Sequence, residues 1–189
     1  IFEELTKTDN QYRNDARYYH AHILYIDENY DEALKYFNLI KNYEKYKDIA
    51  DTYILQINFE KNNYTEVCLN GDEILNKAKK KRKADIALMM AESWYHQGDY
   101  SKSIEYYKIV NENSNRKLPR EVEFKIAFCM MKTNDFEGAI DHFAKVTDSD
   151  DELGQYGSYY MAQCYTNTGQ DKFARNTFYK AYKMNLNDS

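Results

Sequence analysis

One pattern returns five times along this chain at an almost constant interval, and it constrains the fold more strongly than any other feature. A first series of positions is separated by 34, 36, 36 and 35 residues, and a second series repeats the same gaps. A period of this length is typical of one supersecondary unit that is copied and stacked. The first series is Ala21, Leu55, Ala91, Ala127 and Ala162, and the second is Ala33, Val67, Ser103, Ala139 and Ala174.

Each copy is predicted to be two helices joined by a short turn. In the third copy, Ala87, Ala91 and Trp94 fall on one helical face, Gly98 ends that helix, and a second apolar stripe runs over 100–110. The chain has only six Gly and one Pro, which favours helix throughout. Because the connection is so short, the two helices must be antiparallel neighbours.

These residues resemble the tetratricopeptide repeat. The likeness is carried by Trp94, Gly98-Asp99-Tyr100, Ser103, Tyr107 and Val110, and again by residues 29–37, and it extends over residues 15–184. The resemblance implies a right-handed α-solenoid whose first helices line a concave groove. It also implies that the groove binds a protein or a peptide.

We therefore predict one all-α domain over residues 1–189, with residues 1–8 ending a preceding helix. An N-terminal Ile in place of Met favours a piece of a longer protein, and the Lys, Asn, Ile and Tyr content favours a bacterial, AT-rich genome. The predicted repeats are 14–46, 47–82, 83–118, 119–150 and 151–185.

The second copy departs from the pattern of the others. Leu55 and Val67 replace small residues, and Gly71 stands where other copies carry Phe or Tyr. We interpret this as an exchange of volume across one packing site. Since Gly within a helix costs about 1 kcal/mol, this copy is expected to be the least stable.

The candidate binding surface is the stripe of each first helix beside the small-residue stripe. Its aromatic character is unusual for a surface and favours a groove that binds a partner. The alternative is that these rings only pack between adjacent first helices. The predicted groove residues are Tyr18, His22, Tyr25, Gln56, Phe59, Leu88, Glu92, Tyr95, Phe124, Phe128, Met131, Tyr159 and Gln163.

Two charged runs are interpreted as structural. The basic run 77–83 is placed at the C-terminal end of a helix, where the helix dipole favours cations, and a nucleic-acid patch is the less favoured alternative. The acidic run 148–152 precedes the last copy, where Asp or Ser can cap a helix.

Composition argues against several classes of function. A net charge of −5 does not favour nucleic-acid binding, and no apolar run reaches the ~20 residues that span a bilayer. The three Cys are expected to be buried small side chains. No spacing of His and Cys matches a metal site, and no motif matches a catalytic or cofactor-binding site.

We therefore expect a non-enzymatic scaffold that binds a peptide or helix in the concave groove, without cofactor. One alternative is a glycan- or small-ligand-binding solenoid of the bacterial envelope, and another is a sensor segment of a larger signalling protein. Self-association through uncapped ends is a further expectation, since terminal repeats usually carry polar caps. The sequence leaves the partner's identity open, and also the compartment, whether bacterial cytoplasm or periplasm.

Overall fold

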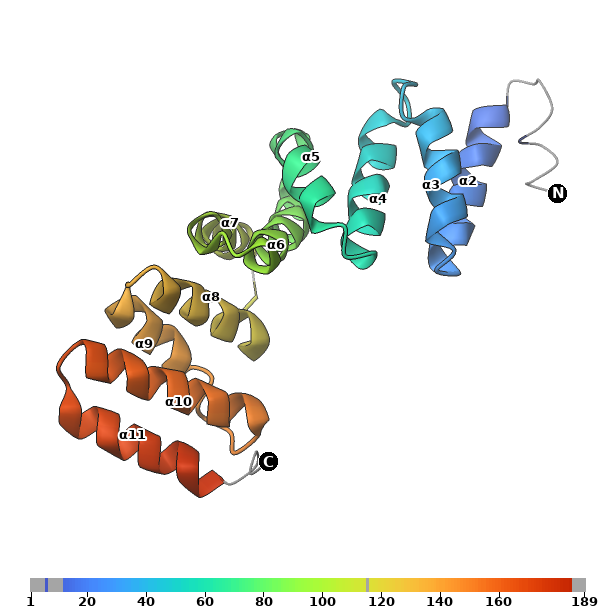
Figure 1. The fold of residues 1–189 in the computed structure, drawn as a ribbon. Helices are drawn as coiled ribbons and strands as arrows, with labels where there is room; N and C mark the ends of the chain where they lie inside the picture. Colours follow the sequence, from blue (N-terminus) through green and yellow to red (C-terminus); the bar gives the residue numbers. More distant parts are fainter. Residues whose placement is uncertain (1–5, 7–11, 115, 185–189) are drawn as a thin grey trace. The chain divides into compact units, whose positions relative to one another are not determined.

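The computed structural model describes residues 6, 12–114 and 116–184, and this part of the chain is all-α, with ten long helices and no strand (Figure 1). The helices are α2 (Arg13–Ile26), α3 (Tyr30–Ile40), α4 (Lys47–Glu60), α5 (Tyr64–Lys77), α6 (Lys80–Gln97), α7 (Tyr100–Asn113), α8 (Arg120–Lys132), α9 (Phe136–Ala144), α10 (Glu152–Asn167) and α11 (Asp171–Met184).

The ten helices follow one another as five pairs, which confirms the predicted helix–turn–helix repeats. Here repeat 1 is α2 and α3, repeat 2 is α4 and α5, and so on to repeat 5, which is α10 and α11. The third pair begins at Lys80, three residues ahead of the predicted boundary at 83. The predicted helix over residues 1–8 lies outside the described residues, apart from Thr6.

The turn inside each repeat has one residue with a left-handed backbone, as its sequence predicts. The next residue then donates its N–H to the carbonyl five residues earlier, at 2.8–3.1 Å, which caps the first helix of the repeat. Gly and Asn suit this geometry, and Glu28 is the one departure. The left-handed residues are Glu28, Asn62, Gly98, Asn134 and Gly169, with φ between 57° and 78°.

All ten residues of the two repeating series are buried, the small ones and the larger Leu55 and Val67 alike. Their exposed fractions run from 0% to 5%. A larger side chain at such a contact would typically cost ~1–3 kcal/mol through overpacking. The small side chains therefore explain why the pattern returns with so little variation.

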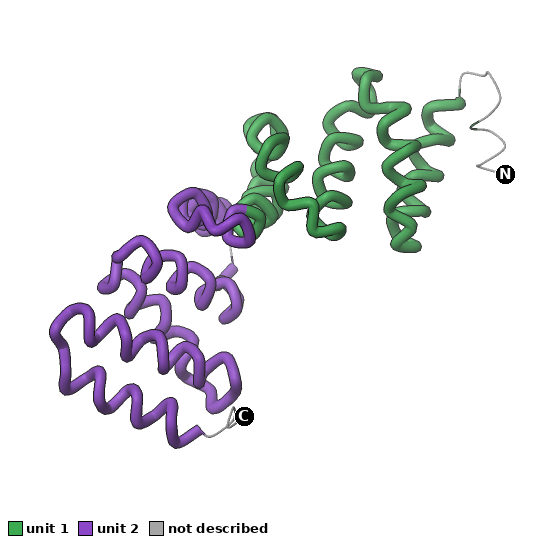
Figure 2. The backbone as a smooth tube through the Cα atoms, in the orientation of Figure 1, with its two compact units in different colours: residues 1–93 green, residues 94–189 purple. Residues whose placement is uncertain are grey.

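The chain divides into two compact units, residues 1–93 and 94–189, and the boundary lies within α6 (Figure 2). Phe37, Ile40 and Ile57 are fully buried in the core of the first unit. Phe143 and Cys164 are fully buried in the core of the second unit. A single solenoid over residues 1–189 stays a prediction.

Gly71 in α5 is explained by a side chain of the following helix. A Cβ added at Gly71 would lie 2.6 Å from the sulfur of Met90 in α6, which is too close for any real contact. Met90 is fully buried. The volume missing from α5 is therefore supplied by Met90, together with the larger Leu55 and Val67 at the small-residue positions.

Candidate functional site

The thirteen predicted groove residues lie on the surface of the first helices, and none of them is fully buried. Twelve are half-buried, and Tyr159 is 45% exposed. This degree of burial fits both a partner-binding face and rings that pack against neighbouring helices. The contacts of each ring separate the two interpretations.

In the first unit, the rings of repeat 1 pack against Tyr53 of α4. The ring centroid of Tyr53 lies 5.5 Å from that of His22 and 5.1 Å from that of Tyr25, both in edge-to-face geometry. Tyr53 also stacks on the buried ring of Phe37 at 4.8 Å, with only 9° between the ring planes. These rings therefore hold repeat 2 against repeat 1.

In the second unit, Tyr160 of α10 makes the corresponding contacts. Its ring centroid lies 6.0 Å from that of Phe124 and 5.4 Å from that of Phe128. It also stacks on Phe143 at 6.1 Å, with 18° between the ring planes. Phe124 and Phe128 thus contribute to the packing of repeat 5 on repeat 4.

The packing roles of Tyr53 and Tyr160 were not predicted, although the sequence holds a signal for them. Each lies two residues before the small-residue position of its first helix, namely Leu55 and Ala162. This position holds Tyr in three copies, and the copies that precede Tyr53 and Tyr160 carry a Phe four residues after Ala33 and Ala139, a combination that would have predicted the pairing. Adjacent aromatic pairs contribute ~0.5–1.5 kcal/mol beyond the area they bury.

A third set of ring contacts lies inside the repeats. Tyr25 contacts Tyr30, Phe59 contacts Tyr64, and Tyr95 contacts Tyr100, with centroids 5.9–6.0 Å apart. The second ring of each pair directly follows the turn. The aromatic after the turn therefore packs between the two helices of its repeat, as the sequence predicts.

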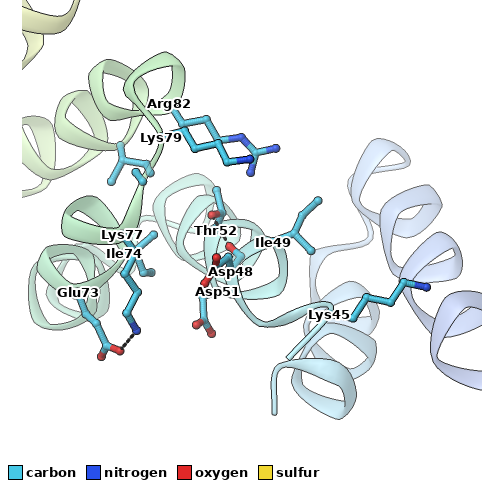
Figure 3. Close-up of a pocket in the computed structure, with 12 residues that line it drawn as sticks. Lys45, Asp48, Ile49, Asp51, Thr52, Glu73, Ile74, Lys77, Lys79 and Arg82 are labelled. Atoms are coloured by element: carbon cyan, nitrogen blue, oxygen red, sulfur yellow. Dashed lines mark hydrogen bonds and ion pairs between the residues drawn. The ribbon is translucent and has the colours of Figure 1, made fainter. Parts of the chain in front are cut away.

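One hollow of the first unit lies between α4, α5 and the start of α6 (Figure 3). It has a volume of about 330 Å³, and its apolar lining comes from Ile49, Ile74 and Ile86. A smaller hollow of about 140 Å³ shares Thr52, Arg82 and Ile86 with it and reaches Gln56, which is one of the predicted groove residues. Together they form a depression beside the first-helix stripe.

Charged side chains surround this depression. Glu73 and Lys77 of α5 form an ion pair at 2.5 Å. Figure 3 shows Lys79 and Arg82 at the side formed by the start of α6, with Asp48 and Asp51 on α4. Burial raises the pKa of the Asp51 carboxyl above its ordinary value. The depression is therefore lined by isoleucine side chains, which form its apolar floor, and by both cationic and carboxylate side chains around them.

The structure corrects the placement of the basic run 77–83. Only Lys77 ends a helix, because α5 stops there and α6 begins at Lys80. The residues 80–83 form the first turn of α6, which holds no acidic residue. The helix dipole disfavours cations at this end. The dipole therefore does not explain the run, and its one described ion pair is that of Lys77 with Glu73.

The acidic run 148–152 caps a helix, as predicted. The Asp151 carboxylate accepts a hydrogen bond from the Gly154 N–H at 2.8 Å at the start of α10. It also pairs with both terminal nitrogens of Arg120, at 2.6 and 3.0 Å. The Arg120 guanidinium and the capping N–H lower the pKa of Asp151 to about 2.

One buried carboxylate was not predicted. Glu123 of α8 is 4% exposed, lies 2.5 Å from Nδ1 of His142, and accepts hydrogen bonds from Lys145 at 3.2 and 3.3 Å. Both partners come from α9 and its C-terminal end. A buried carboxylate with such partners is typical of a structural contact, and here it joins the two helices of repeat 4.

The cysteines behave as small core residues. Cys129 and Cys164 are fully buried, and burial raises the pKa of each thiol to about 11. A thiol with so high a pKa is a poor nucleophile near neutral pH. Over the part of the chain that the structure describes, no cluster of three His, Cys, Asp or Glu side chains is arranged to hold a metal.

Among the described helices, none is long and apolar enough to cross a bilayer. A search of curated protein sequences gives no significant match. The family model described as "Tetratricopeptide repeat" matches residues 121–151, which correspond to most of repeat 4.

Several solved structures share the fold along almost the whole chain. YrrB, described as a TPR protein with an unusual peptide-binding site, matches with a TM-score of 0.79 at 15% identity, over 100% of this chain and 94% of its own. MamA AMB-1 matches with a TM-score of 0.75 at 13% identity, over 95% and 96%. A putative kinesin light chain of Podosopora anserina with TPR-like repeats matches with a TM-score of 0.59 at 10% identity, over 94% and 97%.

Proposed function

We propose that this chain, which has the tetratricopeptide-repeat fold with roughly five repeats, is a non-enzymatic scaffold that binds a peptide segment of a partner protein. The similarity to YrrB supports the general role, because that protein carries a peptide-binding site on the same fold. The fold itself does not specify the function, so the choice of surface depends on the residues of this chain.

The observation that carries the proposal is the depression beside α4 and α6 in the first unit. Its volume of about 330 Å³ admits one or two side chains of a peptide, and its isoleucine floor suits an apolar one. Arg82 lines both hollows and stands beside Gln56 of the predicted groove. A guanidinium at this place favours a carboxylate next to the apolar side chain.

The aromatic rings of the first-helix stripe are not the main binding groups in this proposal. Tyr25, Phe124 and Phe128 already contact rings of neighbouring helices, so a charge introduced there would disturb the repeat stack as well as a partner. The informative substitutions are therefore at the polar lining of the depression. The proposed partner is a peptide with an apolar side chain flanked by Asp or Glu.

The test is selection of binding peptides from a random twelve-residue display library, followed by titration of the best peptide by fluorescence anisotropy. We expect the selected peptides to share an acidic residue beside an apolar one. Arg82→Glu should weaken their binding at least ~tenfold, because it replaces attraction by repulsion. Lys81→Glu is the matched control, since Lys81 is an exposed neighbour in the same helical turn and does not line the depression.

If Arg82→Glu and Lys81→Glu weakened binding equally, the loss would come from the change in net charge alone, and the proposal would be contradicted. Selection of peptides without an acidic residue would contradict it as well. A signal on a glycan array, with no peptide selected, would favour the glycan-binding alternative. The fold of both variants is verified by circular dichroism.

A further inference from the structure

A further hollow adjoins the depression on the side of α4 that faces α3 and α5, and we call it the α3–α5 hollow. Its volume is about 340 Å³, and residues of all three helices line it. Asp51, Glu73 and Ile74 line both this hollow and the depression. Figure 3 shows Asp51 and Glu73 on the opposite side of the depression from Lys79 and Arg82. A peptide bound at Arg82 therefore reaches the α3–α5 hollow when it extends past Asp51.

The two hollows differ in the charge of their linings. The α3–α5 hollow has one cation, Lys41, and three carboxylates, which are those of Asp51, Glu66 and Glu73. The 330 Å³ hollow of the depression also has three carboxylates, but they are outnumbered by four cations, namely Lys45, Lys77, Lys79 and Arg82. The formal charge of the lining therefore changes from positive to negative along the site.

Three asparagines add further hydrogen-bond acceptors to the α3–α5 hollow. Asn38, Asn58 and Asn70 each donate a side-chain N–H to the backbone carbonyl four residues earlier, at 2.8–2.9 Å. Their amide oxygens are then left to accept. Among the described residues, only the oxygen of Asn58 has a donor, which is the side chain of Asn63 at 3.2 Å. A ligand that matches this hollow must therefore supply several N–H donors.

Asp51 is the acceptor at the junction of the two hollows. Its carboxylate is half-buried and accepts no hydrogen bond from the described residues. Burial raises its pKa, and Glu73 acts in the same direction, although three lysines favour the charged form, namely Lys41, Lys47 and Lys77. A carboxylate that loses water without gaining a donor is stabilised when a ligand brings a cationic donor to it.

We propose that an arginine of the bound peptide occupies the α3–α5 hollow and pairs there with Asp51. This inference rests on the peptide-binding function proposed above and adds a second specificity-determining residue to it. Arginine matches the hollow because its planar guanidinium carries five N–H donors, whereas the lining supplies mainly acceptors. The peptide then has an acidic and an apolar residue at Arg82 and a basic residue beyond Asp51. The opposite charges at the two ends favour one orientation of the peptide along the site.

The test is selection on the whole chain from a twelve-residue display library in which every peptide keeps a central Glu-Leu pair and all other positions are random. We expect the selected peptides to be enriched in Arg on one side of the pair. The best peptide and a copy with Ala in place of that Arg are then titrated by fluorescence anisotropy. Asp51→Asn should weaken binding of the Arg peptide at least ~fivefold and leave that of the Ala copy unchanged, because the two groups interact directly.

Asp48→Asn is the matched control. It removes the same charge from the same helix one turn earlier, and Asp48 lines the depression without lining the α3–α5 hollow. It should change the affinities for the Arg peptide and the Ala copy by the same factor. Glu66→Gln is a second variant at an exposed position of the α3–α5 hollow, and it should weaken only the Arg peptide. Circular dichroism verifies the fold of all three variants.

Peptides that are selected without enrichment of Arg would overturn this inference alone, because Arg82 and the isoleucine floor would still account for binding of the Glu-Leu pair. Asp51→Asn and Glu66→Gln variants that weaken the Arg peptide and the Ala copy equally would overturn it as well. A selection that yields no peptide would overturn both this inference and the function on which it rests.

Discussion

The contact between repeats 1 and 2 and the contact between repeats 4 and 5 use the same rings but opposite polar partners. Both place a Tyr of the later repeat on a buried Phe of the earlier one. In the first contact, Asp15 of the earlier repeat pairs with Lys45, which precedes α4, at 2.5 Å. In the second, Arg120 of the earlier repeat pairs with Asp151, which precedes α10.

The difference shows which part of a repeat contact is restricted and which part is interchangeable. A ring must fill a defined volume in a defined register, so the same residue types recur. A surface ion pair only needs opposite signs, so the acid and the base can exchange places. In the first contact the Asp15 carboxylate also accepts a hydrogen bond from the Tyr46 hydroxyl. In the second, Arg120 binds its carboxylate with two nitrogens and also donates to the Val146 carbonyl at 2.6 Å.

Removing the two Tyr rings should have the largest effect on this comparison. Tyr53→Ala and Tyr160→Ala should each lower the free energy of unfolding by about 2–3 kcal/mol, because each leaves a cavity against a buried Phe. The measurement is urea denaturation followed by circular dichroism. The two losses should be similar, since the ring contacts are equivalent.

Tyr53→Phe and Tyr160→Phe are the matched controls, because they keep the ring and remove only the hydroxyl. Both should remain within about 1 kcal/mol of the wild type. A loss confined to one of the two Ala variants would show that the similar ring geometries do not contribute equally.

The contact at Gly71 involves no aromatic ring. Adding a methyl group there should change the stability by less than removing a Tyr ring does, and the sign of the change should depend on Met90. Gly71→Ala should lower stability by about 1 kcal/mol, because overpacking against Met90 exceeds the gain in helix propensity. In a Met90→Ala background the same change should raise stability, since the added methyl then fills space. A double-mutant cycle in urea measures this coupling, and additive effects would contradict the packing account.

The smallest expected effect concerns the polar contact of Asp151 and its dependence on pH. The pKa of this carboxyl is about 2 in the folded chain, below its value in an unfolded chain, so its contribution to stability is present above about pH 4 and is lost as the pH falls towards 2. Asp151→Asn keeps a helix cap but removes the charge. Its thermal midpoint should lie below that of the wild type at pH 7 and approach it near pH 2.

Asp15→Asn gives the same comparison at the other contact. The Lys45 side chain, followed by Tyr46, lowers the pKa of Asp15, so the stabilising effect again disappears in acid. If the stability difference between either variant and the wild type grew as the pH fell, the stabilising role of that carboxylate's charge would be contradicted.

Much of the fold could be predicted because the period, the small residues and the turn residues are local in sequence. Ala21 and Ala33 are fully buried as expected, and Asn62, Gly98 and Asn134 adopt the expected left-handed backbone. The ring contacts of Tyr53 and Tyr160 were missed because they join residues of different repeats. The basic run was misplaced because α6 begins one turn earlier than its apolar pattern indicates.

The sequence by itself determined the number of helix pairs, the places where their backbones touch and the conformation of each turn, since each depends on residues close together along the chain. Only the tertiary structure decided which of the half-exposed rings serve packing and where a depression remains beside Arg82. The physical reason is that a side chain on a helix surface is directed by its own helix, but what it touches depends on the helix that packs beside it.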